Sequence, residues 1–180
     1  MKKLVILVGF LITISFLFSD PFEFLTEYEK NTMKISIDGV QVDYPLLWFE
    51  KFDPDVFERL FEAEVAQILN PCEYILEVDL ESNLKSVERF ELIGLKCGRK
   101  FDLDLLENLL PKGKKVYISY DPISEDGRVY LWVRNMGRFI LMNVVFMMNG
   151  YAEFDENQEF LYKRKFEKLD ELLEDLESEP

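Results

Sequence analysis

The side chains best able to do chemistry in this chain are basic residues concentrated between residues 96 and 138. This stretch holds nine lysines and arginines against six carboxylates, although the whole chain carries a net charge of −14. The basic residues are Lys96, Arg99, Lys100, Lys112, Lys114, Lys115, Arg128, Arg134 and Arg138. Such a run most often indicates an ordinary mixed surface, which we expect here. Its functional alternative is a groove that binds an anion.

Histidine is absent from the sequence. This absence excludes general acid–base catalysis by imidazole, nucleophiles activated by a neighbouring histidine, and zinc sites with histidine ligands. The enzyme classes that depend on imidazole are therefore excluded.

Three segments in a fixed order form the most informative pattern. Residues 87–95 predict a strand, Asp126-Gly127-Arg128 is a turn that leads into an apolar strand, and Leu141–Ala152 predicts a helix that stops at a glycine. In order and spacing, these pieces resemble the staphylococcal nuclease-like (thermonuclease) family over residues 73–175. The resemblance implies a small barrel of the OB type and a metal-dependent phosphodiesterase, which needs no histidine.

The family's catalytic positions can be followed through this chain. Its members use carboxylates to hold a hard cation and two arginines to clamp the phosphate. The arginine of the Gly-Arg turn matches Arg128. The arginine of the third strand falls on Glu91, and Arg89 lies two residues away on the same strand face as a substitute. The acidic positions after that strand fall on Lys96 and Arg99.

The resemblance therefore implies that the metal site is lost. Lys96 and Arg99 would repel Ca²⁺, and together with Arg128 they form the candidate anion site. The family's first-strand acidic motif is replaced around Glu77 and Asp79, which are the weak candidates for metal ligands. We expect no cofactor, and Ca²⁺ only if the domain is still a nuclease.

Several of these residues also have a purely structural interpretation. Arg128 pairs with a carboxylate such as Asp121 or Glu125, unless it keeps an anion contact. In a buried helix, the amide of Asn143 would satisfy backbone groups of a loop. The remaining apolar side chains of this region are expected in the core: Trp132, Met142, Phe146, Met147 and Met148.

Residues 20–71 predict an accessory extension made of a hairpin and a helix. Met33–Tyr44 alternates apolar and polar residues on both sides of Asp38-Gly39, which predicts a hairpin. Asp53-Pro54 is a typical helix start, apolar residues follow at helical spacing, and Asn70-Pro71 would end the helix.

Residues 72–180 predict the main domain. Strands are expected at 74–80, 86–95, 115–121 and 128–134, and helices at 101–110, 140–148 and 158–176. The resemblance and the local pattern agree on an α+β, mainly β architecture, namely a five-stranded Greek-key barrel of the OB type with three helices.

The first residues predict export. Lys2 and Lys3 precede an uncharged run over residues 4–18, which indicates a signal within residues 1–19 that is either cleaved or kept as an anchor. Any membrane attachment would run through residues 4–18. In an exported protein Cys72 and Cys97 permit one disulfide, but we favour two small buried residues.

The expected function is that of an exported, nuclease-like domain that has lost catalysis and binds a protein or an anionic ligand. The negative charge disfavours nucleic acid, because phosphate attraction dominates such binding. One alternative is a divergent secreted nuclease that hydrolyses DNA or RNA with Ca²⁺, using Arg89, Arg128 and carboxylates of Glu77, Asp79 or Glu91. Another is an assembly role, with the N-terminal extension and the acidic last helix as contact surfaces.

Overall fold

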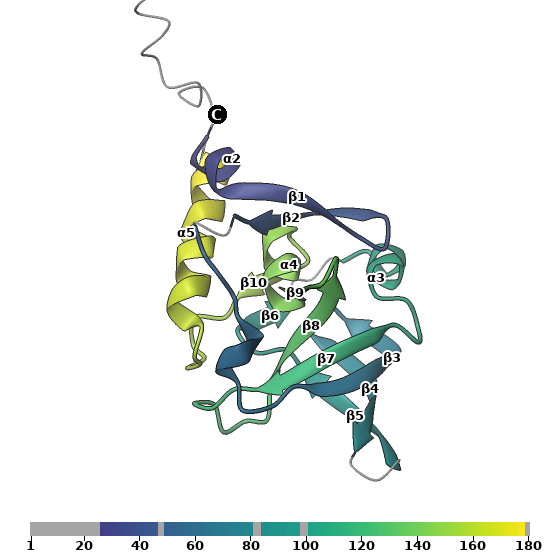
Figure 1. The fold of residues 1–180 in the computed structure, drawn as a ribbon. Helices are drawn as coiled ribbons and strands as arrows, with labels where there is room; N and C mark the ends of the chain where they lie inside the picture. The colour runs from purple at the N-terminus through teal and green to yellow at the C-terminus, as the bar shows by residue number, and fades with distance from the viewer. Residues whose placement is uncertain (1–25, 47–48, 81–83, 98–100, 179–180) are drawn as a thin grey trace, which may run out of the picture.

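A six-stranded antiparallel sheet dominates the described part of the chain, which in this computed structural model comprises residues 26–46, 49–80, 84–97 and 101–178 (Figure 1). The strand order is β5-β4-β3-β7-β8-β9. The strands are β3 (Phe61–Asn70), β4 (Glu73–Leu80), β5 (Leu84–Glu91), β7 (Lys115–Tyr120), β8 (Val129–Asn135) and β9 (Arg138–Leu141). The α+β, mainly β class is confirmed. None of the helices in these residues is long and apolar enough to cross a membrane, and the predicted signal lies outside them.

The predicted N-terminal hairpin is confirmed. Strands β1 (Thr32–Ile37) and β2 (Val40–Pro45) pair in register around Asp38-Gly39, where both residues have positive φ. The short helix α2 (Glu27–Asn31) precedes them and starts at Thr26 with a capping box. Asn149 fixes the hairpin to the rest of the molecule, because its amide bonds both the N–H and the C=O of Asp43.

The predicted helix over residues 53–70 is wrong. Asp53 caps only a single 3-10 turn, η1 (Pro54–Val56), and the rest of the segment forms β3. The pairing of β3 with β4 shifts at two places, which leaves Ala66 and then Leu69 as extra residues. The first shift places the buried residues Val65 and Ile68 three positions apart, as they would be on a helix.

Strand β3 also removes the expected boundary between residues 71 and 72. It lies inside the sheet, between β4 and β7, and contributes the buried side chains of Ala63 and Val65. Residues 61–70 therefore belong to the main body and not to an accessory extension.

A parallel contact joins two strands that are far apart in the sheet order. Leu92, directly after β5, forms a bridge with Val129, the first residue of β8, and the N–H of Ile93 donates to the C=O of Val129 at 3.0 Å. Strand β6 (Leu95–Cys97) then pairs with β10 (Ala152–Phe154). The end of β5 is thereby held beside the start of β8.

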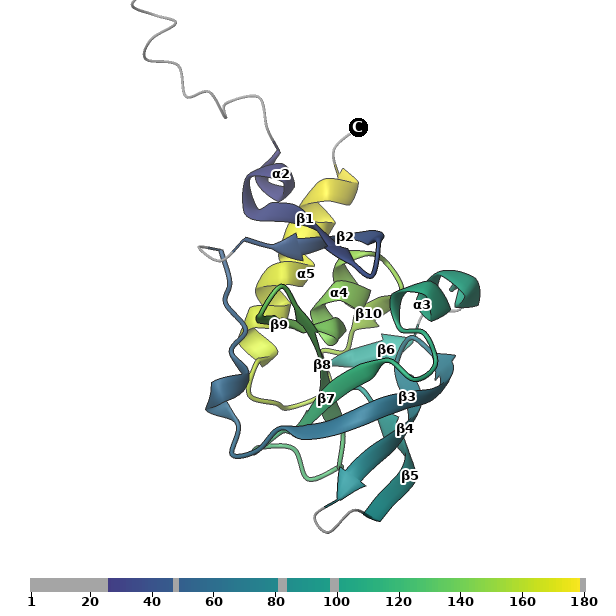
Figure 2. The ribbon, with the colours of Figure 1, turned by 45° about the vertical axis from the view of Figure 1, so that its right-hand side comes forward.

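Helices cover this arrangement from two sides (Figures 1 and 2). The predicted buried helix is α4 (Met142–Met148), all of whose residues are buried. The predicted acidic C-terminal helix starts later than expected, as α5 (Lys163–Ser178), and buries Phe166 and Leu169. The predicted middle helix is α3 (Leu103–Leu109), which Asp102 caps through the N–H of Leu105.

Candidate functional site

Arg89 and Arg128, the two arginines of the candidate site, both line one open depression of about 460 Å³. We call it the arginine depression. Its lining residues are Arg89, Glu91, Asp126, Gly127 and Arg128. The parallel bridge between Leu92 and Val129 creates it, because it places the end of β5 against the loop that precedes β8. The structure thus brings together the matched arginine, its suggested substitute and Glu91.

Arg128 is held by two carboxylates, but not by those expected. Its Nε atom lies 3.3 Å from Glu91 Oε2 and 3.3 Å from Asp126 Oδ2. The predicted pairing with Asp121 or Glu125 is therefore wrong. Glu91 is the residue that stands where the resemblance expects an arginine, so the sign reversal at this position supplies a partner to Arg128.

Asp121 has a different task, as a buried cap for its own loop. One carboxylate oxygen accepts from the N–H groups of Ile123 and Ser124, and the other accepts from the Tyr130 hydroxyl at 2.6 Å and the N–H of Leu161. Burial and this hydrogen bond raise the pKa of Tyr130 well above its usual range. The cluster joins the β7–β8 loop to the segment that leads into α5.

Arg89 is also engaged by a carboxylate. Its guanidinium lies 2.7 Å from Glu73, and this hydrogen bond raises the pKa of Arg89. Glu73 is the register partner of Glu91 in the β4–β5 ladder. Two arginines thus meet three carboxylates here, counting Asp126, so the depression offers no surplus of positive charge to an anion.

The pKa of Asp126 is lowered by its surroundings. Burial alone raises it, but hydrogen bonds from the Ser124 hydroxyl and the Arg128 N–H outweigh this effect, and the charge of Arg128 adds to them. Asp126 is therefore ionised over the neutral range and remains available to Arg128.

Of the predicted anion groove of Lys96, Arg99 and Arg128, the two described residues, Lys96 and Arg128, do not meet in the arginine depression. Lys96 lies on β6 and approaches Glu153 of the paired strand β10 at 3.5 Å, while Arg99 lies outside the described residues. Lys96 is not among the residues that line the arginine depression.

The weak metal candidates Glu77 and Asp79 lie too far along β4 to serve this site. Glu77 is four residues from Glu73, about 13 Å in an extended strand, and it pairs with Lys85 at 2.5 Å. In the described residues no group of three or more acidic or cysteine side chains is placed to hold a metal ion.

Asn143 bonds buried backbone groups, as predicted, but two of these groups belong to strand β8 and not to a loop. Its side-chain oxygen accepts from the N–H of Leu131 at 2.9 Å, and its NH₂ group donates to the C=O groups of Ile93 and Val129. One buried amide thereby fastens the residues that follow β5 to β8. Trp132, Phe146 and the three methionines of α4 are buried, as predicted.

Cys72 and Cys97 form a disulfide, with Cα atoms 5.9 Å apart. The favoured interpretation of two buried thiols is wrong, because Cys97 is exposed and is bonded to Cys72. The disulfide links the turn between β3 and β4, which holds Cys72, to the end of β6, which holds Cys97. Both cysteines line a smaller hollow of about 170 Å³ together with Glu73, Glu91 and Arg128. The even cysteine count was the only sequence signal for this link.

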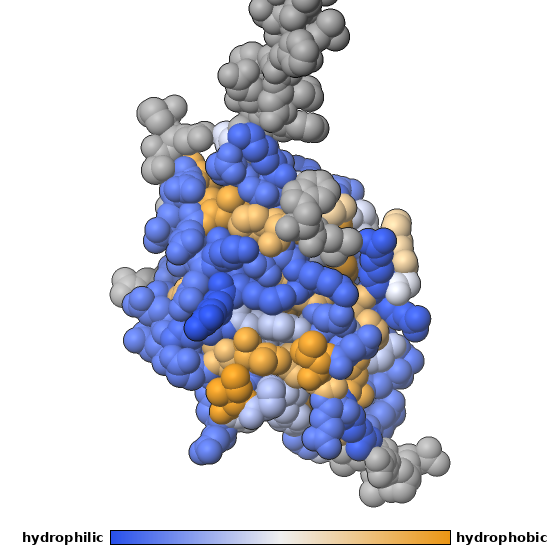
Figure 3. Space-filling view, turned by 60° about the vertical axis from the view of Figure 1, so that its left-hand side comes forward, coloured by the Kyte–Doolittle hydropathy of each residue, from blue (hydrophilic) through white to orange (hydrophobic). Residues whose placement is uncertain are grey.

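Figure 3 shows a face of the molecule on which apolar side chains gather within a polar surface. Exposed apolar residues include Val56, the last residue of η1, and Ile123 in the β7–β8 loop, which are 54% and 56% exposed. A hollow of about 540 Å³ lies between these segments, where the Arg59 guanidinium covers the Phe61 ring at 4.5 Å. Among the described residues, this apolar patch is consistent with the alternative of a role in assembly.

No protein-family model, curated protein or solved structure matches this chain. The function of this chain is therefore inferred from the geometry of its own residues.

Proposed function

We propose that this chain is an exported, non-catalytic binding domain of the OB type, related in plan to the nuclease-like family that its sequence resembles. One observation carries the proposal: both arginines that would clamp a phosphate are already engaged by the chain's own carboxylates. Arg89 pairs with Glu73, and Arg128 pairs with Glu91 and Asp126.

The strand arrangement supports the OB part of this proposal. In such a barrel the sheet closes on itself between strands that are not neighbours in sequence. The parallel bridge from Leu92 to Val129 joins β5 to β8, and this contact would complete a ring of β5, β4, β3, β7 and β8.

The electrostatics of the whole chain support a partner other than nucleic acid. The net charge is −14, and association with a polyanion gains its affinity from neutralising phosphates with lysine and arginine. A protein partner is consistent with both the overall charge and the neutralised arginine depression.

Cleavage assays on the full-length chain test the proposal. Single-stranded DNA and RNA are incubated with the wild type, Arg128→Ala and Arg134→Ala, with and without Ca²⁺. Arg134 is the matched control, because it is exposed and lies at the far end of β8. We expect no Ca²⁺-dependent cleavage by any of the three. Cleavage that Arg128→Ala abolishes and Arg134→Ala retains would overturn the proposal.

A divergent Ca²⁺-dependent nuclease is the second candidate, and one observation favours it. Glu73 and Glu91 are direct register partners at the end of the ladder where both arginines lie. If these two carboxylates shared a Ca²⁺ ion, both arginines would be released toward a phosphate. Calorimetric titration with Ca²⁺ distinguishes the candidates, since this alternative requires binding that Glu73→Gln removes.

A further inference from the structure

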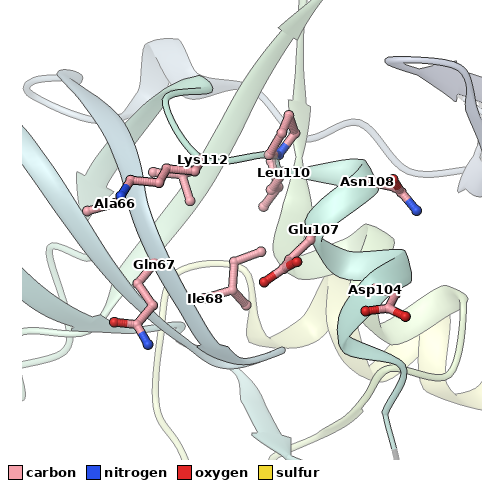
Figure 4. A pocket seen from close by; sticks show the side chains of 10 residues that line it. Ala66, Gln67, Ile68, Asp104, Glu107, Asn108, Leu110 and Lys112 are labelled. Carbon is pink, nitrogen blue, oxygen red and sulfur yellow. The ribbon is translucent and has the colours of Figure 1, made fainter.

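Another hollow lies away from the arginine depression, between β3 and α3 (Figure 4). It has a volume of about 700 Å³, and we call it the β3–α3 groove. Val65, Ala66, Gln67 and Ile68 line one wall, and the other is formed by α3 and the turn after it. Figure 4 shows Ile68 and Glu107 directed into the space between the two walls.

One wall of the groove is the uncovered edge of a strand. Strand β7 pairs with β3 only from Phe61 to Glu64, and Val65 makes the last backbone bonds on that side, with Lys114 and Gly113. Beyond this point β3 continues to Asn70, paired with β4 alone among the described strands. Because a strand directs alternate backbone groups to opposite edges, part of the N–H and C=O groups of residues 66–69 point away from β4, toward the groove side.

The opposite wall carries two carboxylates. Asp104 and Glu107 are three residues apart and so lie on one face of α3. Both are exposed, and neither forms an ion pair or a side-chain hydrogen bond with any described residue. Lys112, at one end of the groove, is the single cation among the described residues that line it.

The floor of the groove is apolar. Val65, Ile68 and Leu110 are buried, with at most 7% of their surface exposed. The site thus combines a strand edge, an apolar floor and an acidic wall.

We propose that the β3–α3 groove binds an extended peptide segment of another protein, which adds to the free edge of β3 as a strand and carries lysine or arginine toward Asp104 and Glu107. Main-chain hydrogen bonds to a strand edge supply affinity in this mode of recognition, and alternate side chains supply specificity. Residues 66–69 span about 13 Å of strand, which matches a segment of roughly four residues. The acidic wall excludes a polyanion. The inference rests on the proposed binding function, for which it names a partner chemistry.

Fluorescence anisotropy on the full-length chain tests this site with labelled seven-residue peptides. One peptide alternates valine and lysine, a second alternates valine and glutamate, and a third is the lysine peptide with every second backbone nitrogen methylated. We expect the wild type to bind only the first, because the second is repelled and the third has lost its donors along one edge. Equal binding of the first and third peptides would overturn strand addition.

Two kinds of variant locate the binding. Asp104→Lys combined with Glu107→Lys reverses the acidic wall, and Ala66→Trp fills the groove. Each should weaken binding of the lysine peptide at least tenfold. Glu125→Lys combined with Glu171→Lys is the matched control, because it makes the same charge change at exposed positions outside the groove. An equal loss in the control would show general attraction to an acidic protein and would overturn the site.

The outcomes of the peptide and cleavage assays are independent. Peptide binding by a chain that also cleaves nucleic acid would refute the proposed non-catalytic function but would still support the β3–α3 groove as a peptide-binding site. A chain that neither binds the peptide nor cleaves would refute the groove and leave the proposed function.

Discussion

The arginine depression and the β3–α3 groove are made from the same kinds of charged side chain, but those side chains are in different states. In the depression, Arg128 and Arg89 are each within 3.3 Å of a carboxylate of the same chain. In the groove, Asp104 and Glu107 have no cationic partner among the described residues. The charges of the first region are satisfied within the fold, while those of the second have no such partner in the part of the chain that the structure describes.

The difference follows from the elements that hold the charges. Glu73 and Glu91 are fixed opposite one another by the β4–β5 register, so the arginines beside them have partners in every folded molecule. The acidic residues of α3 face a strand edge with no described strand to cover it. Composition alone cannot distinguish charged side chains that are paired within the fold from those that are not. The ion pairs of each residue in the structure make this distinction.

The largest effect is expected from Asn143→Leu, which breaks the frame of the arginine depression. The substitution leaves the buried N–H of Leu131 and the C=O groups of Ile93 and Val129 without their partner. Unfolding in denaturant should show a loss of about 4 kcal/mol, given roughly 1–3 kcal/mol for each buried group left unsatisfied.

Asn108→Leu is the matched control for that measurement, because Asn108 is exposed on α3. Its effect on the free energy of unfolding should stay within about 0.5 kcal/mol. Similar losses in both variants would contradict the role assigned to Asn143.

Reduction of the disulfide should have the next largest effect. The bond joins residues 25 positions apart, and the loop-closure relation gives about 3.5 kcal/mol for a loop of this length. Denaturant unfolding with and without a reductant measures the difference. The double variant Cys72→Ala with Cys97→Ala should be insensitive to the reductant, and an unchanged wild type would show that the link does not stabilise the fold.

Release of the arginines should convert the first region into an anion site. Glu73→Gln with Glu91→Gln leaves Arg89 and Arg128 with Asp126 as the single carboxylate of the depression. Binding of single-stranded DNA at low salt should strengthen about fivefold over the wild type, and the gain should disappear at high salt. Glu62→Gln with Glu64→Gln on β3 controls for the change in net charge, and an equal gain there would refute the idea.

The smallest effect is a pH dependence at Asp126. Its pKa is lowered below the ordinary value of 3.8, so its contribution to stability is present above that value and is lost as pH falls through the folded pKa. Because the group is largely exposed, the contribution should be only a few tenths of a kcal/mol. The free energy of unfolding of Asp126→Asn should therefore fall less than that of the wild type between pH 5 and pH 3.

Local patterns predicted the elements whose causes are local. The Asp38-Gly39 turn predicted the hairpin, the helical spacing of apolar residues over 101–110 predicted α3, and the amide of Asn143 was expected to serve backbone groups. The pairing of Arg128 with Glu91 could not be found in this way, because Glu91 lies 37 positions away and becomes a neighbour only through the contact between β5 and β8.

The sequence of strand β3 predicts a helix because extra residues disturb the alternation of its buried side chains. Phe61, Val65 and Ile68 follow at intervals of four and three, which are the spacings of an amphipathic helix. The groove was missed for a related reason. It depends on where the pairing of β7 with β3 stops, and no residue type marks that point.

The extra residue Ala66 has a consequence for how such a surface can arise. Without it, Ala63, Val65 and the isoleucine would alternate regularly, and the core would keep the same three side chains. The extra residue therefore serves the edge of the strand and not its buried face. A surface of this kind can be gained or lost through the insertion or deletion of a single codon, while the interior of the protein remains as it was.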